Sequence, residues 1–351
     1  MFVEFKHGNS ADPFVDPKDG SFPKLFGTPS ATRGQLVLYA TRQQAYQFRT
    51  SIISIGIFGK VARFFRWDRT GCLVTAPIDY SKPKGNKQLT EFFLRLDQMA
   101  NDREGRGWDP TVVDPTAREV ELFDAAIREV CGGKPQPQAP FRGMRTRSQT
   151  QAARRNRVAN PMFSKLRESV GDHDKYPRKK VSVLHGEVEK IEKKYIVGRP
   201  ISIPKSPTGR ATRGFLALSL DTGNLVFLKD SWRPDIECIK KEDHWYQLLR
   251  KEEGPGKAYI GTFLHGSDVY ATQRFVKCTG KAQRTVTNRC AKDVGRTDEI
   301  MGYIHYRVVQ TELYLPLEMF RDSKHLVSIM HDIALGTLFK TFAMYLSLTF
   351  Q

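Results

Sequence analysis

A lysine and a glutamate in the second half of the chain could together hold an anionic group. Lys229 ends the apolar run LVFL (225–228), which is typical of a buried strand. A lysine within a sheet is costly unless a carboxylate neutralises its charge. Glu242 is the best-placed carboxylate, because it would share one face of the next helix with Ile239, Tyr246 and Leu249. The spacing predicts an ion pair between Lys229 and Glu242; the alternative is a solvated lysine at a strand end and a glutamate at a helix edge.

A glycine-containing segment before these residues has the composition of a phosphate-covering turn. Residues 205–214 read KSPTGRATRG, so Gly209 and Gly214 lie among the basic residues Lys205, Arg210 and Arg213. Backbone amides near glycines can approach phosphate oxygens closely, and basic side chains neutralise them. The spacing is not G-x-G-x-x-G, however, and a plain surface loop is the alternative interpretation.

The elements that must position Lys229 and Glu242 predict an antiparallel sheet of five strands with one packed helix. GFLALSL (214–220), the turn DTGN (221–224) and LVFLKDSW (225–232) form a strong hairpin pattern. YIVG (195–198), AYIGTFLHG (258–266) and IHYRVVQ (304–310) are the other strand candidates. A helix is expected from Pro234 to about Lys251, and another over residues 323–333.

The first half of the chain predicts a smaller block that precedes this lobe. Residues 1–30 are rich in Gly, Pro, Asp and Ser and indicate an irregular arm. Residues 31–133 contain a helix pattern at 35–49, three short strand patterns at 51–77 and two amphipathic helix patterns, the second opened by the capping box Thr116-x-x-Glu119. The predicted fold class is therefore α+β, with a small α+β block at 31–133 and the sheet-and-helix lobe at 181–333.

Basic residues are concentrated between the two predicted units. The chain carries a formal net charge of +18, and residues 141–180 hold 12 Lys and Arg against 3 acidic residues, a surplus of 9 and half of the total. With the Pro-rich start KPQPQAP, residues 134–180 are predicted to be a disordered basic linker. Such a linker could contact an anionic partner such as nucleic acid. The most basic stretch, MRTRSQTQAARRNR (144–157), has no aromatic side chain of its own, and only Phe141 and Phe163 at its ends could stack on bases. A solvated linker without a specific partner is therefore the favoured interpretation.

Four segments of the sequence resemble the fungal-type protein kinase family. They are ARFFRWDRTGCLVTAPIDY (62–80), KSPTGRATRGFLALSLDTGNLVFLKDSWRP (205–234), KKEDHWYQLLRKE (240–252) and LPLEMFRDSKHLVSIMHDI (315–333). The resemblance implies that 181–333 is a protein-kinase-like N-terminal lobe that binds ATP and whose full-length relatives phosphorylate protein Ser or Thr. It makes Lys229 the phosphate-contacting lysine and Glu242 its helix glutamate. It also makes residues 311–315, including Glu312 and Leu313, the segment that holds the adenine.

The sequence lacks the residues that such a kinase uses for phosphoryl transfer. That chemistry needs an H-R-D aspartate as base, an Asn for the second magnesium ion and a D-F-G aspartate for the metal. Beyond Glu312 there is no Asn, and the only Asp residues are Asp322 and Asp332. We therefore expect no catalytic and no metal-binding residues, weak or lost ATP binding, and a catalytically silent first lobe truncated before its catalytic loop. The alternative is a non-catalytic binding or scaffold module that uses the basic linker.

Residues 334–351 form an atypical apolar tail without a counterpart in the family. The segment IALGTLFKTFAMYLSLTF invites comparison with a membrane helix, but it is short of about 20 residues and carries Lys340 near its middle. A membrane anchor is therefore not favoured. Five widely spaced cysteines predict neither a disulfide framework nor a zinc site. The first residues do not resemble a signal peptide, so an intracellular location, cytoplasm or nucleus, is expected.

Overall fold

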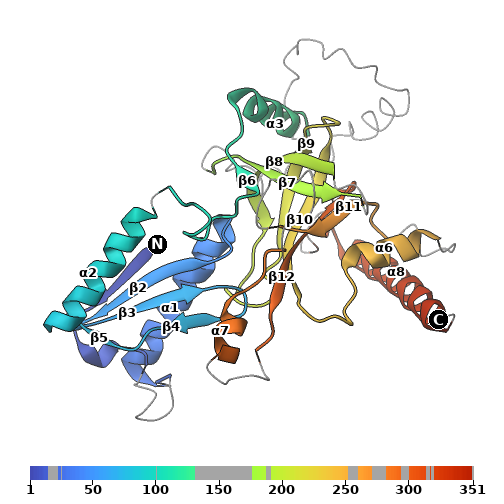
Figure 1. The fold of residues 1–351 in the computed structure, drawn as a ribbon. Helices are drawn as coiled ribbons and strands as arrows, with labels where there is room; N and C mark the ends of the chain where they lie inside the picture. Colours follow the sequence, from blue (N-terminus) through green and yellow to red (C-terminus); the bar gives the residue numbers. More distant parts are fainter. Residues whose placement is uncertain are drawn as a thin grey trace.

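The structure, a computed structural model, contains two β-sheets that follow one another along the chain (Figure 1). It describes residues 1–14, 23–24, 26–99, 101–130, 176–186, 191–251, 260–270, 282–293, 300–313, 317 and 320–349. Strands and helices within these ranges establish a mixed α+β architecture, as the sequence predicts. Residues 131–175 lie outside the described part of the chain, and they include most of the basic linker predicted at 134–180.

The first sheet has five strands and is covered by a helix on each face. Its path is β1 (Phe2–Lys6), β2 (Ile52–Phe58), β3 (Val61–Trp67) and β4 (Cys72–Val74), and β5 (Ile78–Asp79) also pairs with β3. The long helix α1 (Gly27–Tyr46) packs on the face that carries Phe65. On the opposite face, Phe64 stacks on Phe92 of α2 (Pro83–Gln98), with ring centroids 3.8 Å apart. Alternation of side chains along β3 explains this division.

The predicted irregular arm is replaced in part by regular structure. Residues Phe2–Lys6 form β1, which pairs in parallel with β2, and a short 3₁₀ helix, η1, follows at Asn9–Ala11. The helix predicted at 35–49 begins at Gly27 instead, with Pro29 in its first turn. Proline is tolerated there because the first-turn amides have no partner within the helix. Thr32 of this segment is buried although threonine has a low helix propensity.

The second sheet has seven strands rather than the five predicted. Its spatial order is β11 (Phe263–Asp268), β12 (Tyr303–Gln310), β10 (Leu225–Pro234), β9 (Arg213–Ser219), β8 (Ile191–Ser202), β7 (Lys179–His185) and β6 (Val112–Val113). The hairpin predicted from residues 214–232 is confirmed, with Lys229 opposite Gly214. Of the two unpredicted strands, β6 comes from the predicted first block, and β7 spans the predicted boundary between the linker and the lobe at residues 180 and 181.

The boundary predicted at residue 133 does not separate the two sheets. Helix α3 (Ala117–Val130) packs on β8 and β9, and β6 pairs with β7, so both belong to the second sheet. Figure 1 shows α3 over the edge of this sheet and α6 (Glu242–Lys251) beside β11. The short helix α7 (Thr287–Asp293) lies between the two sheets in the same view.

Helix α8 extends well past the predicted end of the lobe. It runs from Ser323 to Thr349, so most of the predicted tail is a continuation of the helix expected at 323–333. In the part of the chain that the structure describes, no helix combines the length and apolar character needed to cross a membrane.

The two faces of the second sheet bury different sets of side chains. One face packs Phe215, Ala217, Val226, Leu228 and Val309 into an apolar core with Phe48, which follows α1. The other, which we call the helix-bearing face, is covered by α3 over Leu216 and Leu218 and by α6 over Tyr306 and Val308. The strand period of two and the observed register place Lys229 on the helix-bearing face, between these two covered regions.

A buried histidine is expected to make the fold sensitive to mild acid. His265 on β11 is 8% exposed, and its ring lies 2.5 Å from the Tyr195 hydroxyl. Burial, helped by nearby His185 and Lys193 and opposed by Asp221, lowers the pKa of His265 to about 4. Because an unfolded histidine titrates near 6.5, stability is complete above that pH and is lost as pH falls toward 4.

We expect this histidine to reduce the free energy of unfolding by about 2 kcal/mol between pH 6.5 and pH 4. Urea unfolding at both pH values, for the wild type and for His265→Gln, measures the difference. The variant should lose clearly less stability over this interval. Equal losses in both proteins would show that His265 does not drive the pH dependence.

Candidate functional site

Lys229 and Glu242 form the ion pair that the sequence predicts. The Lys229 ammonium donates to both carboxylate oxygens of Glu242, at 2.9 and 2.7 Å. The two side chains are 23% and 25% exposed, so the pair is neither buried nor fully solvated. An ammonium has three N–H donors, and two of them are directed at the carboxylate. The third N–H donor of Lys229 is thus held at a fixed place on the helix-bearing face, within a pair that carries no net charge.

Helix α6 places Glu242 by starting at that residue. The expected helix start at Pro234 is wrong, because β10 continues through Pro234 and Ile239 lies outside the helix, largely exposed. The pair forms nevertheless, because the first residue of α6 lies within hydrogen-bonding distance of Lys229. The helix dipole also favours a carboxylate at this end of the helix. The Asp243 amide attaches the start of α6 to the sheet by donating a hydrogen bond to the Tyr306 hydroxyl of β12 at 2.9 Å.

Aromatic packing also attaches α6 to the sheet, one turn beyond Glu242. Tyr246, one turn further along α6, stacks on Phe263 of β11 with ring centroids 5.1 Å apart. Its hydroxyl accepts a hydrogen bond from Gln310 at the end of β12. Because α6 is attached to β11 and β12 in this way, the distance between Glu242 and β10 is set by packing in addition to charge.

The predicted phosphate-covering turn does not assemble as expected. Gly209 lies in the loop between β8 and β9 with φ +84°, and its amide donates to the Arg69 carbonyl of the first sheet's β3–β4 turn at 2.8 Å. Gly214 lies inside β9, where a Cβ would come within 2.9 Å of the Phe227 ring. Arg213 is buried and pairs with Asp230. Lys205 and Arg210 are the basic side chains of this loop that stay exposed.

The expected adenine-binding residues lie at the end of β12. The Glu312 carboxylate accepts the Thr262 amide at 2.6 Å, which ties this segment to the residues that lead into β11. Leu313 is partly buried against the α3 cluster with Leu216 and Leu218. Residues 314–316 lie outside the described part of the chain. Leu313 thus packs toward α3, while Lys229 lies toward α6.

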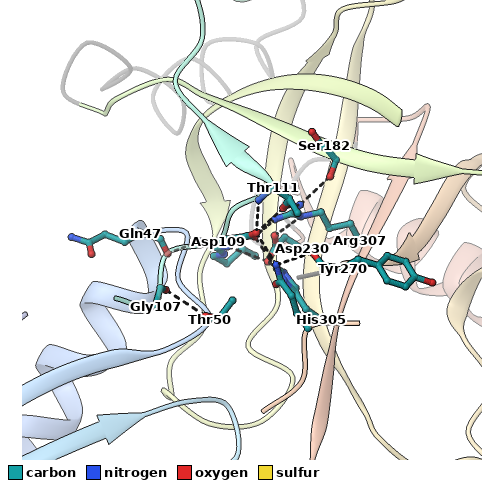
Figure 2. Close-up of polar contacts among 12 residues, drawn as sticks. Gln47, Thr50, Gly107, Asp109, Thr111, Ser182, Asp230, Tyr270, His305 and Arg307 are labelled. Carbon is teal, nitrogen blue, oxygen red and sulfur yellow. Dashed lines mark hydrogen bonds and ion pairs between the residues drawn. The ribbon is translucent and has the colours of Figure 1, made fainter. Parts of the chain in front are cut away.

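A buried group of charged side chains, which includes Asp109, Asp230, His305 and Arg307, lies at the centre of the second sheet (Figure 2). Asp230 follows Lys229 in β10, so its side chain lies on the opposite face of the sheet from the lysine. Fully buried Arg307 of β12 donates from Nε to Asp230 at 2.9 Å and from Nη2 to Asp109 at 2.5 Å. The ring of His305 lies 3.1 Å from the Asp230 carboxylate. We call Asp109, Asp230, His305, Arg307 and Arg213 the buried junction.

Charge compensation keeps the carboxylates of the buried junction ionised. Burial alone would raise the pKa of Asp230, but Arg213, His305 and Arg307 together hold that pKa well below its usual value. Burial likewise opposes ionisation of Asp109, and Arg307 and His305 lower its pKa below the ordinary value. Both carboxylates are therefore ionised at neutral pH, where they pair with Arg213 and Arg307.

The buried junction joins the two halves of the chain. Asp109 follows the first sheet and α2 in sequence, and it also accepts hydrogen bonds from Thr111 and Gln283. A second contact comes from the β3–β4 turn, where Asp68 accepts the amides of Val286 and Thr287 at 2.8 and 2.9 Å. Since Asp230 follows Lys229 in β10, the first half of the chain helps to fix the strand that carries the lysine.

Sequence reasoning missed the buried junction. The hairpin register places Asp230 opposite Arg213, and so one of its ion pairs was accessible in principle. Asp109 and Arg307 are 198 residues apart, and no local pattern connects them. Their pairing depends on how the first half of the chain packs against the sheet.

An open depression of about 420 Å³ lies beside the segment that joins β10 to α6. Of its cations, Arg233 and Lys241 share the single carboxylate of Asp268, and Arg284 pairs with Asp235. Neither Lys229 nor Glu242 lines this depression, so it is separate from the ion pair that the sequence predicts.

Comparisons with protein-family models, with curated proteins and with solved structures give no significant match to this chain. The kinase resemblance therefore rests on the four sequence segments and on the chemistry of the site.

Proposed function

We propose that the second sheet with α6 is a nucleotide-phosphate-binding lobe of the protein-kinase type. The observation that carries the proposal is the pair formed by Lys229 on β10 and Glu242 on α6. In protein kinases a strand lysine contacts the nucleotide phosphates and is held by a helix glutamate. The nucleotide would approach Lys229 on the helix-bearing face, where its side chain is 23% exposed.

The order of elements along the chain supports this proposal. Strand β8, a glycine-containing loop, β9, β10 with the lysine, α6 with the glutamate, β11 and β12 follow one another as in a kinase N-terminal lobe. Arg213 is not expected to contact the phosphates, because its side chain is buried against Asp230. Lys229 is the basic group on which phosphate binding depends.

We further propose that these 351 residues do not catalyse phosphoryl transfer. The acidic and amide ligands that hold magnesium in kinases have no counterpart in the sequence after Glu312. Among the described residues, no cluster of three His, Cys, Asp or Glu side chains is suited to a metal ion. The residues therefore do not fit a catalytic magnesium site. Purified protein is expected to transfer no phosphate from ATP to protein substrates above background.

Binding to Lys229 can be tested by thermal denaturation of the full chain. A non-hydrolysable ATP analogue at about ten times its Kd should raise the free energy of unfolding by about 1.4 kcal/mol and the Tm by a few degrees. Lys229→Ala should abolish this shift, because it removes the cation that contacts the phosphates. Lys193→Ala is the matched control, since Lys193 forms a partly exposed ion pair with Asp221 at 2.8 Å, away from Lys229.

The same experiment separates the proposal from its alternative. If the analogue gives no shift at any concentration, or the same shift with Lys229→Ala, the nucleotide role of this lysine is wrong. Salt-sensitive retention on DNA or RNA without a nucleotide shift would instead favour a binding module that uses the basic residues 141–180.

A further inference from the structure

Helix α3 covers the apolar surface next to Lys229. Phe123 and Ile127 of α3 pack on Ile196, Leu216 and Leu218 of the helix-bearing face, and Phe123 is fully buried. Leu216 and Leu218 lie two and four residues along β9 from Gly214, the residue opposite Lys229. At the usual rise of a strand they are about 7 and 13 Å from that position. This is the scale over which the sugar and base of a nucleotide would extend from a phosphate bound at Lys229.

The phosphate end and the base end of this surface differ in accessibility. Lys229 keeps about a quarter of its side chain exposed, whereas Ile196, Leu216 and Leu218 are almost completely buried. A phosphate group can therefore reach the ammonium, but a flat apolar base finds its binding surface already occupied by Phe123. Buried apolar side chains exclude a ligand ring from the same volume, because protein interiors are close-packed.

Two ion pairs hold α3 from its polar side. Glu119 of the capping box pairs with Lys180 at 3.0 Å, and Asp124 pairs with Arg178 at 2.8 Å. Both carboxylates are partly exposed, but the Arg178 side chain is only 7% exposed, so the Glu119–Lys180 pair is the weaker of the two. Short elements held by few buried side chains open locally at lower cost than the sheet beneath them.

We propose that α3 is an autoinhibitory cover that must lift from β8 and β9 before the base of a nucleotide can bind. The inference rests on the proposed function, because it assigns the regulation of the same site. In the closed state, Lys229 accepts simple polyphosphates and ATP equally, since only phosphates make contact. In the open state the base adds its own contacts with Leu216 and Leu218.

The test uses a variant of the full chain that releases α3 by charge reversal. Glu119→Lys with Asp124→Lys places like charges opposite Lys180 and Arg178. The matched control, Glu121→Lys with Glu129→Lys, makes the same charge change at exposed positions of the same helix. Hydrogen exchange should show faster exchange of the α3 amides in the first variant only. Phe123→Ala weakens the same contact from the apolar side and serves as a second release variant.

Kd values for tripolyphosphate and for a non-hydrolysable ATP analogue are then measured by calorimetry. We expect wild type and control to bind the two ligands with similar Kd values, and the release variants to bind the ATP analogue at least tenfold tighter with tripolyphosphate unchanged. If the α3 amides exchange faster in the release variants but these variants bind the ATP analogue with the same Kd as wild type, α3 is not an autoinhibitory cover. The proposal that Lys229 binds phosphates would still stand. Failure of both ligands to bind any protein overturns the proposed function and the cover together.

Discussion

Replacing Arg307 with methionine will destabilise the protein by about 3–5 kcal/mol, which is a large part of the stability of an ordinary domain. Arg307 is fully buried and neutralises two carboxylates, Asp109 at 2.5 Å and Asp230 at 2.9 Å. Methionine fills a similar volume but leaves these charges buried with only part of their compensation. The Tm should fall by about 10 °C in thermal denaturation followed by circular dichroism.

Two further variants separate the effect of charge from that of packing. Arg307→Met combined with Asp109→Asn should recover part of the loss, because one uncompensated carboxylate is removed. Arg95→Met breaks an exposed pair with Glu91 on α2 and should change stability by less than about 0.5 kcal/mol. If Arg307→Met were as mild as Arg95→Met, the buried junction would not stabilise the contact between the two halves of the chain.

Gly107→Ala is expected to destabilise the protein by about 3 kcal/mol. Gly107 has φ +80°, where a side chain is strained, and a Cβ there would collide with the Ser51 carbonyl oxygen. Its own carbonyl accepts the Thr50 amide, and Asp109 of the buried junction follows two residues later (Figure 2). The backbone must shift to relieve the collision, and this shift moves Asp109 away from Arg307.

A matched glycine distinguishes backbone strain from collision. Gly223, in the turn between β9 and β10, also has a positive φ of +68°, but nothing lies within 4 Å of the place that a Cβ would take. Gly223→Ala should therefore cost only about 1 kcal/mol, the strain of the backbone alone. Urea unfolding of both variants measures the difference. Equal costs for the two would mean that the contact with Ser51 does not constrain the loop that carries Asp109.

The site and its immediate scaffold follow from local sequence patterns. The apolar run before Lys229, the turn at 221–224 and the acidic residue 13 positions later are sufficient to predict a strand, a hairpin and an ion pair. Each of these depends on residues close in sequence, whose side-chain directions are fixed by the periods of strands and helices. The predicted helix start at Pro234 is too early, because Ile239 fits the apolar face of α6 by spacing but precedes its first residue, Glu242.

Contacts between distant segments could not be predicted in this way. Helix α3 has an amphipathic pattern that shows it buries one face, but the pattern does not say which surface receives it. The same holds for β6, a two-residue strand that pairs with β7 across residues that carry no periodic signal. Their position in the chain favours the first block for both, whereas packing places them on the second sheet.

The sequence by itself determined an α+β protein and indicated the Lys229–Glu242 pair as one of two alternatives, because strand and helix periods act over a few residues. Only the tertiary structure decided that Asp109, Asp230 and Arg307 meet in one buried junction and that α3 covers the surface beside Lys229. The physical reason is that burial of a charge or of an apolar face requires a complementary partner but does not specify where along the chain that partner must be.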